Sequence, residues 1–291
     1  MAWLLVGAAL CAQEQPAPDQ AEDANSPKRV AANYTFTEGP AWSREGFLIF
    51  SDIPNNKIFR WQPGAKTELF RDNSEGTNGN AYDAHGRLYT CQGHARRVIR
   101  TDAKGKVDVL ADKWQGKKLN EPNDIVVRRD GNVWFTDPAF GSADERRELD
   151  FYGVYHITPK GVLEVVAKPK GRPNGIALSP DGRTLYVTNS DERNIRAYDV
   201  DRSGAASNER VIASNIEGVP DGMRVDVKGN LYVAAKDLFV YSPEGQLLRT
   251  IHLPETPSNC QFGDEDLQSL FITARTSVYR VRLDVKGALQ Y

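Results

Sequence analysis

The sequence predicts an all-β protein built as a six-bladed β-propeller, and two observations support this. From residue 34 onward, apolar and polar residues alternate in short runs between glycine turns, and helical periodicity is almost absent. Hairpins also recur about every 40 to 50 residues, which is the period of four-stranded propeller blades. Six such units predict six blades.

The segment 120–138 shows the repeat most clearly. Asn123 precedes an alternating apolar run, and Gly131, eight positions later, lies in a turn before a second run. Four more polar residues stand eight positions before a glycine: Glu38 before Gly46, Asn78 before Gly86, Asn174 before Gly182 and Asp221 before Gly229. The sixth unit offers Asn259, although its turn is longer and lacks that glycine. We call these six polar positions the entrance residues.

The remaining strands complete the blades. Segment 194–200 is typical of a third strand, and segments 162–166 and 246–251 are typical of fourth strands. We expect residues 34–36 or 277–283 to close the ring by pairing the two ends of the chain. The charged segment 139–151 interrupts the third unit; we expect a solvated connector, and the alternative is a loop that enters the channel mouth.

Composition excludes two classes of partner. The formal net charge is -2 and Lys and Arg are scattered, which argues against a nucleic-acid partner. No apolar run approaches the roughly 20 residues that span a bilayer, so we expect no membrane span. We expect a small-molecule substrate and a monomer or small homo-oligomer. Cys91 and Cys260 are expected to be buried free thiols.

The first 30 residues differ from the rest. A short apolar run ends in small residues near position 13, and a polar, proline-bearing stretch follows. This predicts a signal peptide and a disordered spacer over residues 1–30, a propeller over residues 31–291, and a periplasmic or secreted protein. Cys11 suggests lipid attachment, but Leu10 is a poor residue before such a processing site.

The entrance residues predict a metal site. Innermost strands of a propeller line its central channel, so these residues should converge. They comprise two carboxylates and four carboxamides, and such oxygen donors suit Ca²⁺ or Mg²⁺, then Mn²⁺, whereas Zn²⁺ normally takes imidazole or thiolate. Without a cation, buried Glu38 and Asp221 would repel each other. We therefore predict one divalent metal ion, with Ca²⁺ preferred over Mg²⁺, Mn²⁺ or Zn²⁺.

Local alternatives exist for these residues. Asn-Gly and Asp-Gly pairs are hairpin turn signals, and we interpret 130–131 and 181–182 in that way. The pairs at 78–79, 174–175 and 221–222 precede a turn that another glycine already supplies. Among the histidines, His94 follows a second strand near the channel mouth and is a candidate substrate contact. His85, His156 and His252 are expected to be structural or solvated.

Several motifs resemble one known family. They are TEGPAW, EPNDIVV with DGNVWFTDP, FYGVYHITPKG, RPNGIALSPDGRTLYVTNS, VPDGMRVD, and SNCQFG with LFITA. Together they resemble gluconolactonase, senescence marker protein (regucalcin) and luciferin-regenerating enzyme, which are six-bladed propellers. The resemblance covers residues 34–284. It implies that Glu38, Asn174 and Asp221 ligate a divalent metal, and that Asn123 is a ligand in some members and a substrate contact in others.

We therefore expect a gluconolactonase-like hydrolase that opens a sugar lactone or similar small ester at a divalent cation. The expected metal ligands are Glu38, Asn123, Asn174 and Asp221, with Asp221 also the catalytic base. The expected substrate contacts are Asn123, Asn78, His94 and Asn259. Two alternatives stay open: a phosphotriesterase-like hydrolase at the same ion, and a non-catalytic binding propeller with a structural metal.

Overall fold

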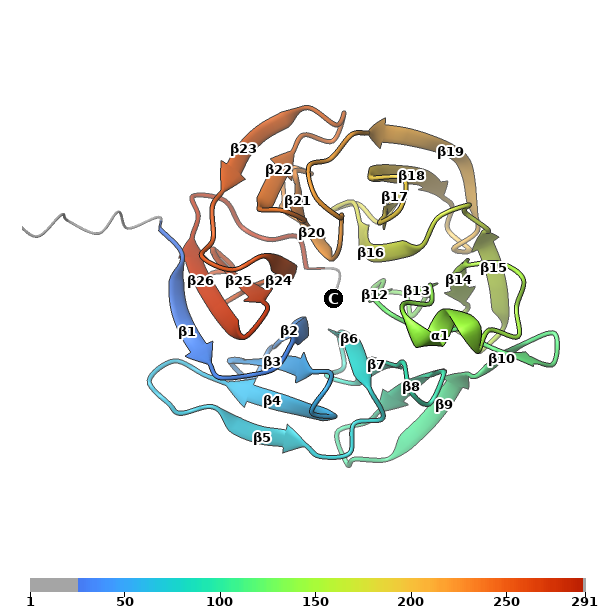
Figure 1. Ribbon diagram of the computed structural model, residues 1–291, viewed down its shortest axis with the longest axis horizontal. Coiled ribbons are helices and arrows are strands. Elements are labelled where there is room, and N and C mark those ends of the chain that lie inside the picture. Colours follow the sequence, from blue (N-terminus) through green and yellow to red (C-terminus); the bar gives the residue numbers. More distant parts are fainter. Residues whose placement is uncertain (1–25, 290–291) are drawn as a thin grey trace, which may run out of the picture.

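Six four-stranded sheets surround a central axis in the computed structural model, which describes residues 26–289 (Figure 1). Every strand in these sheets pairs antiparallel with its neighbour, and five sheets follow the order of the chain from the inside outward. The predicted six-bladed, all-β class is confirmed. The predicted signal peptide lies within residues 1–25, outside the described residues.

The blades follow the chain around the ring. They are β2 to β5 (Thr37–Ser43, Phe47–Asp52, Lys57–Trp61, Glu68–Arg71), β6 to β9 (Thr77–Tyr82, Leu88–Gln92, Arg97–Thr101, Val107–Ala111), β12 to β15 (Ile125–Val127, Val133–Asp137, Gly153–Ile157, Leu163–Ala167), β16 to β19 (Pro173–Leu178, Thr184–Asn189, Asn194–Val200, Ala206–Ala213), β20 to β23 (Met223–Val225, Leu231–Ala234, Leu238–Tyr241, Leu247–Ile251), and β24 to β26 (Pro257–Gly263, Ser269–Ala274, Ser277–Arg282) with β1 (Lys28–Ala32). Two short strands, β10 (Lys113–Trp114) and β11 (Lys117–Lys118), and the helix α1 (Ser142–Glu145) lie between blades or within their loops. No helix in the described range is long and apolar enough to cross a membrane.

The two ends of the chain close the ring. Strand β1 pairs with β26, with Lys28 opposite Arg280, and becomes the outermost strand of the last blade. Pairing of the ends was expected through 34–36 or 277–283. The C-terminal segment does pair, as β26, but its N-terminal partner is 28–32 rather than 34–36, and it begins within the predicted spacer, before residue 31. Tyr34 instead packs its ring 4.9 Å from that of Phe50 in the first blade. Strand β1 thus covers the outer edge of β26.

Apolar side chains between neighbouring blades form the core. One cluster joins Tyr186 and Ile195 of the fourth blade to Met223 and Val233 of the fifth. Each innermost strand can therefore run beside the channel with its neighbours fixed from both sides. This packing holds the ends of the innermost strands in register around the axis.

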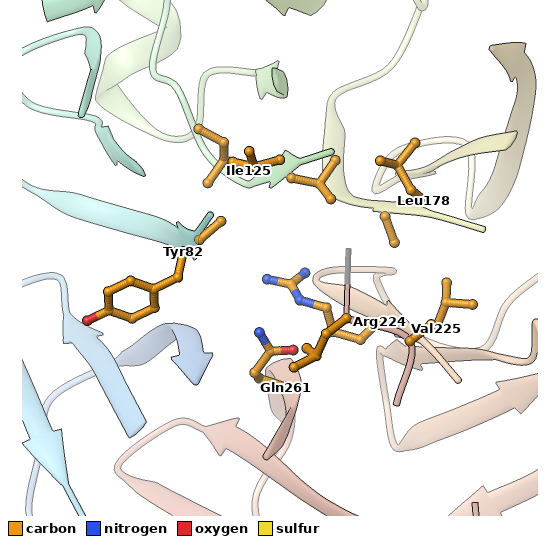
Figure 2. A pocket seen from close by; sticks show the side chains of 12 residues that line it. Tyr82, Ile125, Leu178, Arg224, Val225 and Gln261 are labelled. Carbon is orange, nitrogen blue, oxygen red and sulfur yellow. The ribbon is translucent and has the colours of Figure 1, made fainter. Parts of the chain in front are cut away.

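The C-terminal segment, described up to residue 289, lies across the far end of the channel. Gly287 forms an isolated bridge with Asp226, and the Ala288 N–H donates to the Val225 carbonyl at 2.9 Å. Above this segment lies a cavity of about 50 Å³ with mainly apolar walls. Figure 2 shows the Arg224 guanidinium pointing toward its centre, near Gln261.

Candidate functional site

The opposite end of the channel holds a larger cavity, of about 280 Å³, which we call the entrance cavity. Five of the six entrance residues line it: Glu38, Asn78, Asn123, Asn174 and Asp221. The other lining residues are Phe36, Ile53, Gly76, Gly93, Glu121, Pro122 and Phe140. Residues spread over five blades thus meet where the innermost strands begin.

Irregular strand pairing aims these side chains at the channel. In β2 the register shifts between Glu38 and Ala41, and β6 and β16 shift at the equivalent place. In the third and fifth blades the strand ladder begins only at Ile125 and Met223, two residues after the entrance residue. Bulges of this kind reorient a side chain at the end of a strand.

Glycines after the entrance residues let neighbouring blades approach closely. A Cβ on Gly39 would lie 1.9 Å from the Asn78 carbonyl oxygen, and one on Gly175 would lie 2.4 Å from the Asp221 carbonyl oxygen. Gly39 also has a φ of +51°, in the left-handed region. Gly39 and Gly175 are therefore required by the close contact with the next entrance residue. The hairpin turns are made by other glycines.

Two acids face this cavity at high electrostatic cost. Glu38 is 2% exposed; burial raises its pKa to about 7, with a further increase from the charge of Asp124. Glu38 accepts hydrogen bonds from the Gly39 N–H and from Asn259 Nδ2, the latter at 3.1 Å. Burial, followed by the charge of Glu38, raises the pKa of Asp221 well above its usual range. A cation between these acids would stabilise both ionised forms.

The amides offer oxygen to the same space. Ser190 Oγ donates to the Pro220 carbonyl at 2.8 Å, so it must accept the 3.1 Å hydrogen bond from Asn174 Nδ2. This fixes the orientation of the Asn174 amide and leaves its Oδ1 available. Asn78 Oδ1 is buried and has no hydrogen-bond partner within residues 26–289. A buried oxygen without a donor is costly unless a ligand or ion completes it.

These donors fit an oxygen-coordinated divalent cation. Glu38 and Asp221 supply two negative charges, and the amide oxygens add neutral donors. Across the described chain, no three His, Cys, Asp or Glu side chains are placed to hold a metal ion together. Any ion here would therefore depend on the amides for the rest of its ligands, which matches the preference of Ca²⁺ or Mg²⁺ more than that of Zn²⁺.

The sequence patterns did not predict a buried ion pair that lies beneath the entrance cavity. Asp124 is 1% exposed and lies 3.2 Å from the Arg224 guanidinium. It also accepts the Ile176 N–H at 3.3 Å and lies 3.5 Å from Asn259 Nδ2. One signal was available: the position after the entrance residue is glycine in four units but Asp124 in the third.

Comparison with known proteins identifies the family. The family described as the SMP-30/Gluconolactonase/LRE-like region matches residues 36–276. This chain belongs to that family. A gluconolactonase of Zymomonas mobilis is 34% identical over 305 aligned residues, covering 94% of this chain and 85% of the relative.

Solved structures of similar proteins agree with this membership. A gluconolactonase from Xanthomonas campestris superposes with a TM-score of 0.81 at 37% identity, over 88% of each chain. A calcium-binding protein, regucalcin of Agrobacterium tumefaciens, shares the fold with a TM-score of 0.76 at 18% identity, over 88% of this chain and 94% of that one. The resemblance deduced from the motifs is confirmed.

Two predicted substrate contacts of this SMP-30/gluconolactonase family member do not line the entrance cavity. Asn259 is 1% exposed, and its Oδ1 accepts the Cys260 N–H at 2.8 Å, which turns Nδ2 toward Glu38. His94 is exposed, and its ring lies against Gly76, which does line the cavity. Their roles as substrate contacts stay predictions.

The loop after β13 contributes to the cavity wall. Phe140, at the start of segment 139–151, lines the cavity, while much of the charged remainder is exposed. Asp137 holds the facing segment by accepting the Asn120 and Glu121 N–H groups at 2.8 Å each. Burial raises the pKa of Asp137 to about 7. The start of the loop therefore reaches the channel mouth, which was the alternative to a solvated connector.

Proposed function

We propose that this protein is a metal-dependent hydrolase that opens a sugar lactone or a similar small ester in the entrance cavity. The observation that carries the proposal is the meeting of Glu38 and Asp221, two acids with raised pKa values, beside amide oxygens from three other blades. Similarity to the gluconolactonases of Zymomonas mobilis and Xanthomonas campestris supports a lactone as the substrate.

Four residues would hold the ion: Glu38, Asn123, Asn174 and Asp221. Calcium is the ion we propose, because all of these donors are oxygens and two of them are charged. Asn78 offers a further oxygen whose hydrogen-bonding capacity is unused within the described residues. A bound divalent cation would supply Lewis acidity toward the lactone carbonyl and toward a water molecule.

The chain's own residues would do the rest. Asp221 is partly exposed to the cavity, so one carboxylate oxygen can accept a proton from the attacking water. Asn123 and Asn78 would orient substrate hydroxyls, since both line the cavity and carry donors as well as acceptors. A volume of about 280 Å³ suits a small molecule.

The direct test is Asp221→Asn, which keeps the shape of the side chain and removes its charge. Hydrolysis of glucono-δ-lactone in the presence of calcium should fall at least about a hundredfold, as expected for loss of a general base. Asp150→Asn, on an exposed residue, serves as the matched control and should keep the parent rate. An Asp221→Asn protein that unfolds cooperatively and still turns over at the parent rate would exclude this role.

A further inference from the structure

A third acid, Glu121, lines the entrance cavity together with Glu38 and Asp221. None of the twelve described residues that line this cavity is Lys, Arg or His. The roles proposed above use only two of the three acids. Glu121 is the third acid, and it is not among the proposed metal ligands.

Backbone contacts hold Glu121 in the wall. Its N–H donates to Asp137 Oδ1 at 2.8 Å, and its Oε2 accepts the Phe140 N–H at 3.2 Å. Gly93 provides the room, because a Cβ there would lie 3.1 Å from Glu121 Cγ and 3.4 Å from Oε1. No residue of the described chain donates a hydrogen bond to Oε1. One oxygen is therefore anchored, and the other remains available to a ligand.

The nearby cations are engaged elsewhere. Arg96 donates to the Leu119 carbonyl at 2.6 Å and pairs with Glu148 at 3.2 Å. Arg172 pairs with Asp191, and its guanidinium stacks 4.8 Å over the Phe140 ring. In the described part of the chain, neither guanidinium forms a hydrogen bond or an ion pair with Glu121.

Basic side chains do occur in an adjoining cavity. That cavity shares Phe36 and Asp221 with the entrance cavity and contains Lys236 and Arg275. Lys236 is paired with Glu217. An anionic group of a ligand would therefore meet repulsion on the Glu121 side of the entrance cavity.

Lactone hydrolysis changes the charge of the ligand next to Glu121. A divalent cation would neutralise Glu38 and Asp221, which leaves the single negative charge of Glu121. In lactone hydrolysis, the acyl C–O bond breaks, water oxygen bonds to the carbonyl carbon, and one water proton goes to the former ring oxygen. The acid then releases the second proton. An uncharged substrate becomes an anionic product in a cavity with excess negative charge.

We propose that Glu121 makes the entrance cavity select uncharged lactones over lactones that carry an acidic group, and that it promotes release of the carboxylate product. This inference rests on the proposed lactone hydrolysis. Glu121 acts here as a specificity residue through its charge and takes no part in bond breaking. The chemistry favours a neutral polyhydroxylated lactone as the substrate class.

Glu121→Gln tests the idea, because the amide can still accept the Phe140 N–H while the charge is lost. With calcium present, the inhibition constant of gluconate should fall about tenfold, since a like charge at close range is removed. Glucitol, an uncharged analogue, should inhibit the variant and the parent within about twofold. Glu145→Gln removes the same charge from an exposed site on the neighbouring loop and should leave both constants unchanged.

The substrate preference should change in parallel. The ratio of kcat/KM for glucono-δ-lactone to that for glucarolactone, which bears a free carboxylate, should fall about tenfold in Glu121→Gln. Unchanged gluconate inhibition in an active Glu121→Gln protein would overturn the inference and leave lactone hydrolysis intact. If the parent opens no lactone, the proposed function fails; calorimetric titration of calcium-loaded protein with gluconate then decides the charge selection separately.

Discussion

The two ends of the channel differ in size, polarity and charge. The entrance end has a cavity of about 280 Å³ with three acids in its wall, whereas the far end has about 50 Å³ with apolar walls. The far end contains one cation, Arg224, and the segment 284–289 covers it. The entrance end is thus built for a polar ligand or ion, and the far end is built as a seal.

Side chains link the two ends. Arg224 pairs with Asp124, and Asn259 Nδ2 lies 3.5 Å from Asp124 and 3.1 Å from Glu38. The positive charge at the far end therefore offsets an acid that would otherwise destabilise the entrance acids. The ionised state of the entrance acids therefore depends on a cation, Arg224, that does not line the entrance cavity.

The largest expected effect is on this link. Arg224→Met should lower the free energy of unfolding by about 3–5 kcal/mol, because Asp124 would be left as a buried, unpaired charge. Urea denaturation measures this. The double variant Arg224→Met with Asp124→Asn should recover much of the loss. A single variant as stable as the parent would show that the pair does not support the entrance.

A second change acts on the backbone of the entrance end. Gly39→Ala should cost about 3 kcal/mol of stability and weaken calcium binding, since its Cβ would overlap the Asn78 carbonyl oxygen. Gly46→Ala is the control in the same hairpin: it also has a positive φ, of +85°, but nothing lies within 4 Å of its Cβ. It should cost only about 1 kcal/mol. Equal losses would mean that the close approach of the blades is unimportant.

Calcium and pH should act together at the entrance. The folded-state pKa of Glu38, about 7, exceeds its ordinary value of 4.5, so the metal-free folded protein binds more protons between these values than the unfolded chain. Its unfolding free energy should therefore decrease as pH rises through this window. Calcium at about a hundredfold above Kd should add about 2.7 kcal/mol near pH 8 and less near pH 5. Thermal melts with and without a chelator measure both effects; a calcium increment independent of pH would contradict the account.

The smallest effect is expected at the far end. Leu289→Ala should lower stability by about 1 kcal/mol, because this partly buried side chain packs against the cluster that contains Phe47 and Tyr82. The rate of lactone hydrolysis should stay within about twofold of the parent, since the residue lies away from the entrance. A large loss of rate in a stable variant would show that the two ends are coupled more strongly than the contacts indicate.

The sequence predicted the blade number and the convergence of five entrance residues because strand alternation and the eight-residue interval are local features. It did not predict that Asn259 turns its amide toward Glu38, since that depends on contacts between the first and last blades. Nor did it predict the Asp124 to Arg224 pair, which joins positions 100 residues apart. The C-terminal closing strand was predicted, but its N-terminal partner was placed too late, because Tyr34 and its neighbours alternate like a strand but pack against the first blade.

The most direct test of the central claim is anomalous diffraction from crystals grown with calcium or manganese. We expect one peak in the entrance cavity, within ligand distance of Glu38, Asn174 and Asp221. Crystals of Glu38→Gln should lose most of this peak. A cavity without a bound cation at saturating metal, or a peak elsewhere with the acids paired to Lys or Arg, would contradict it.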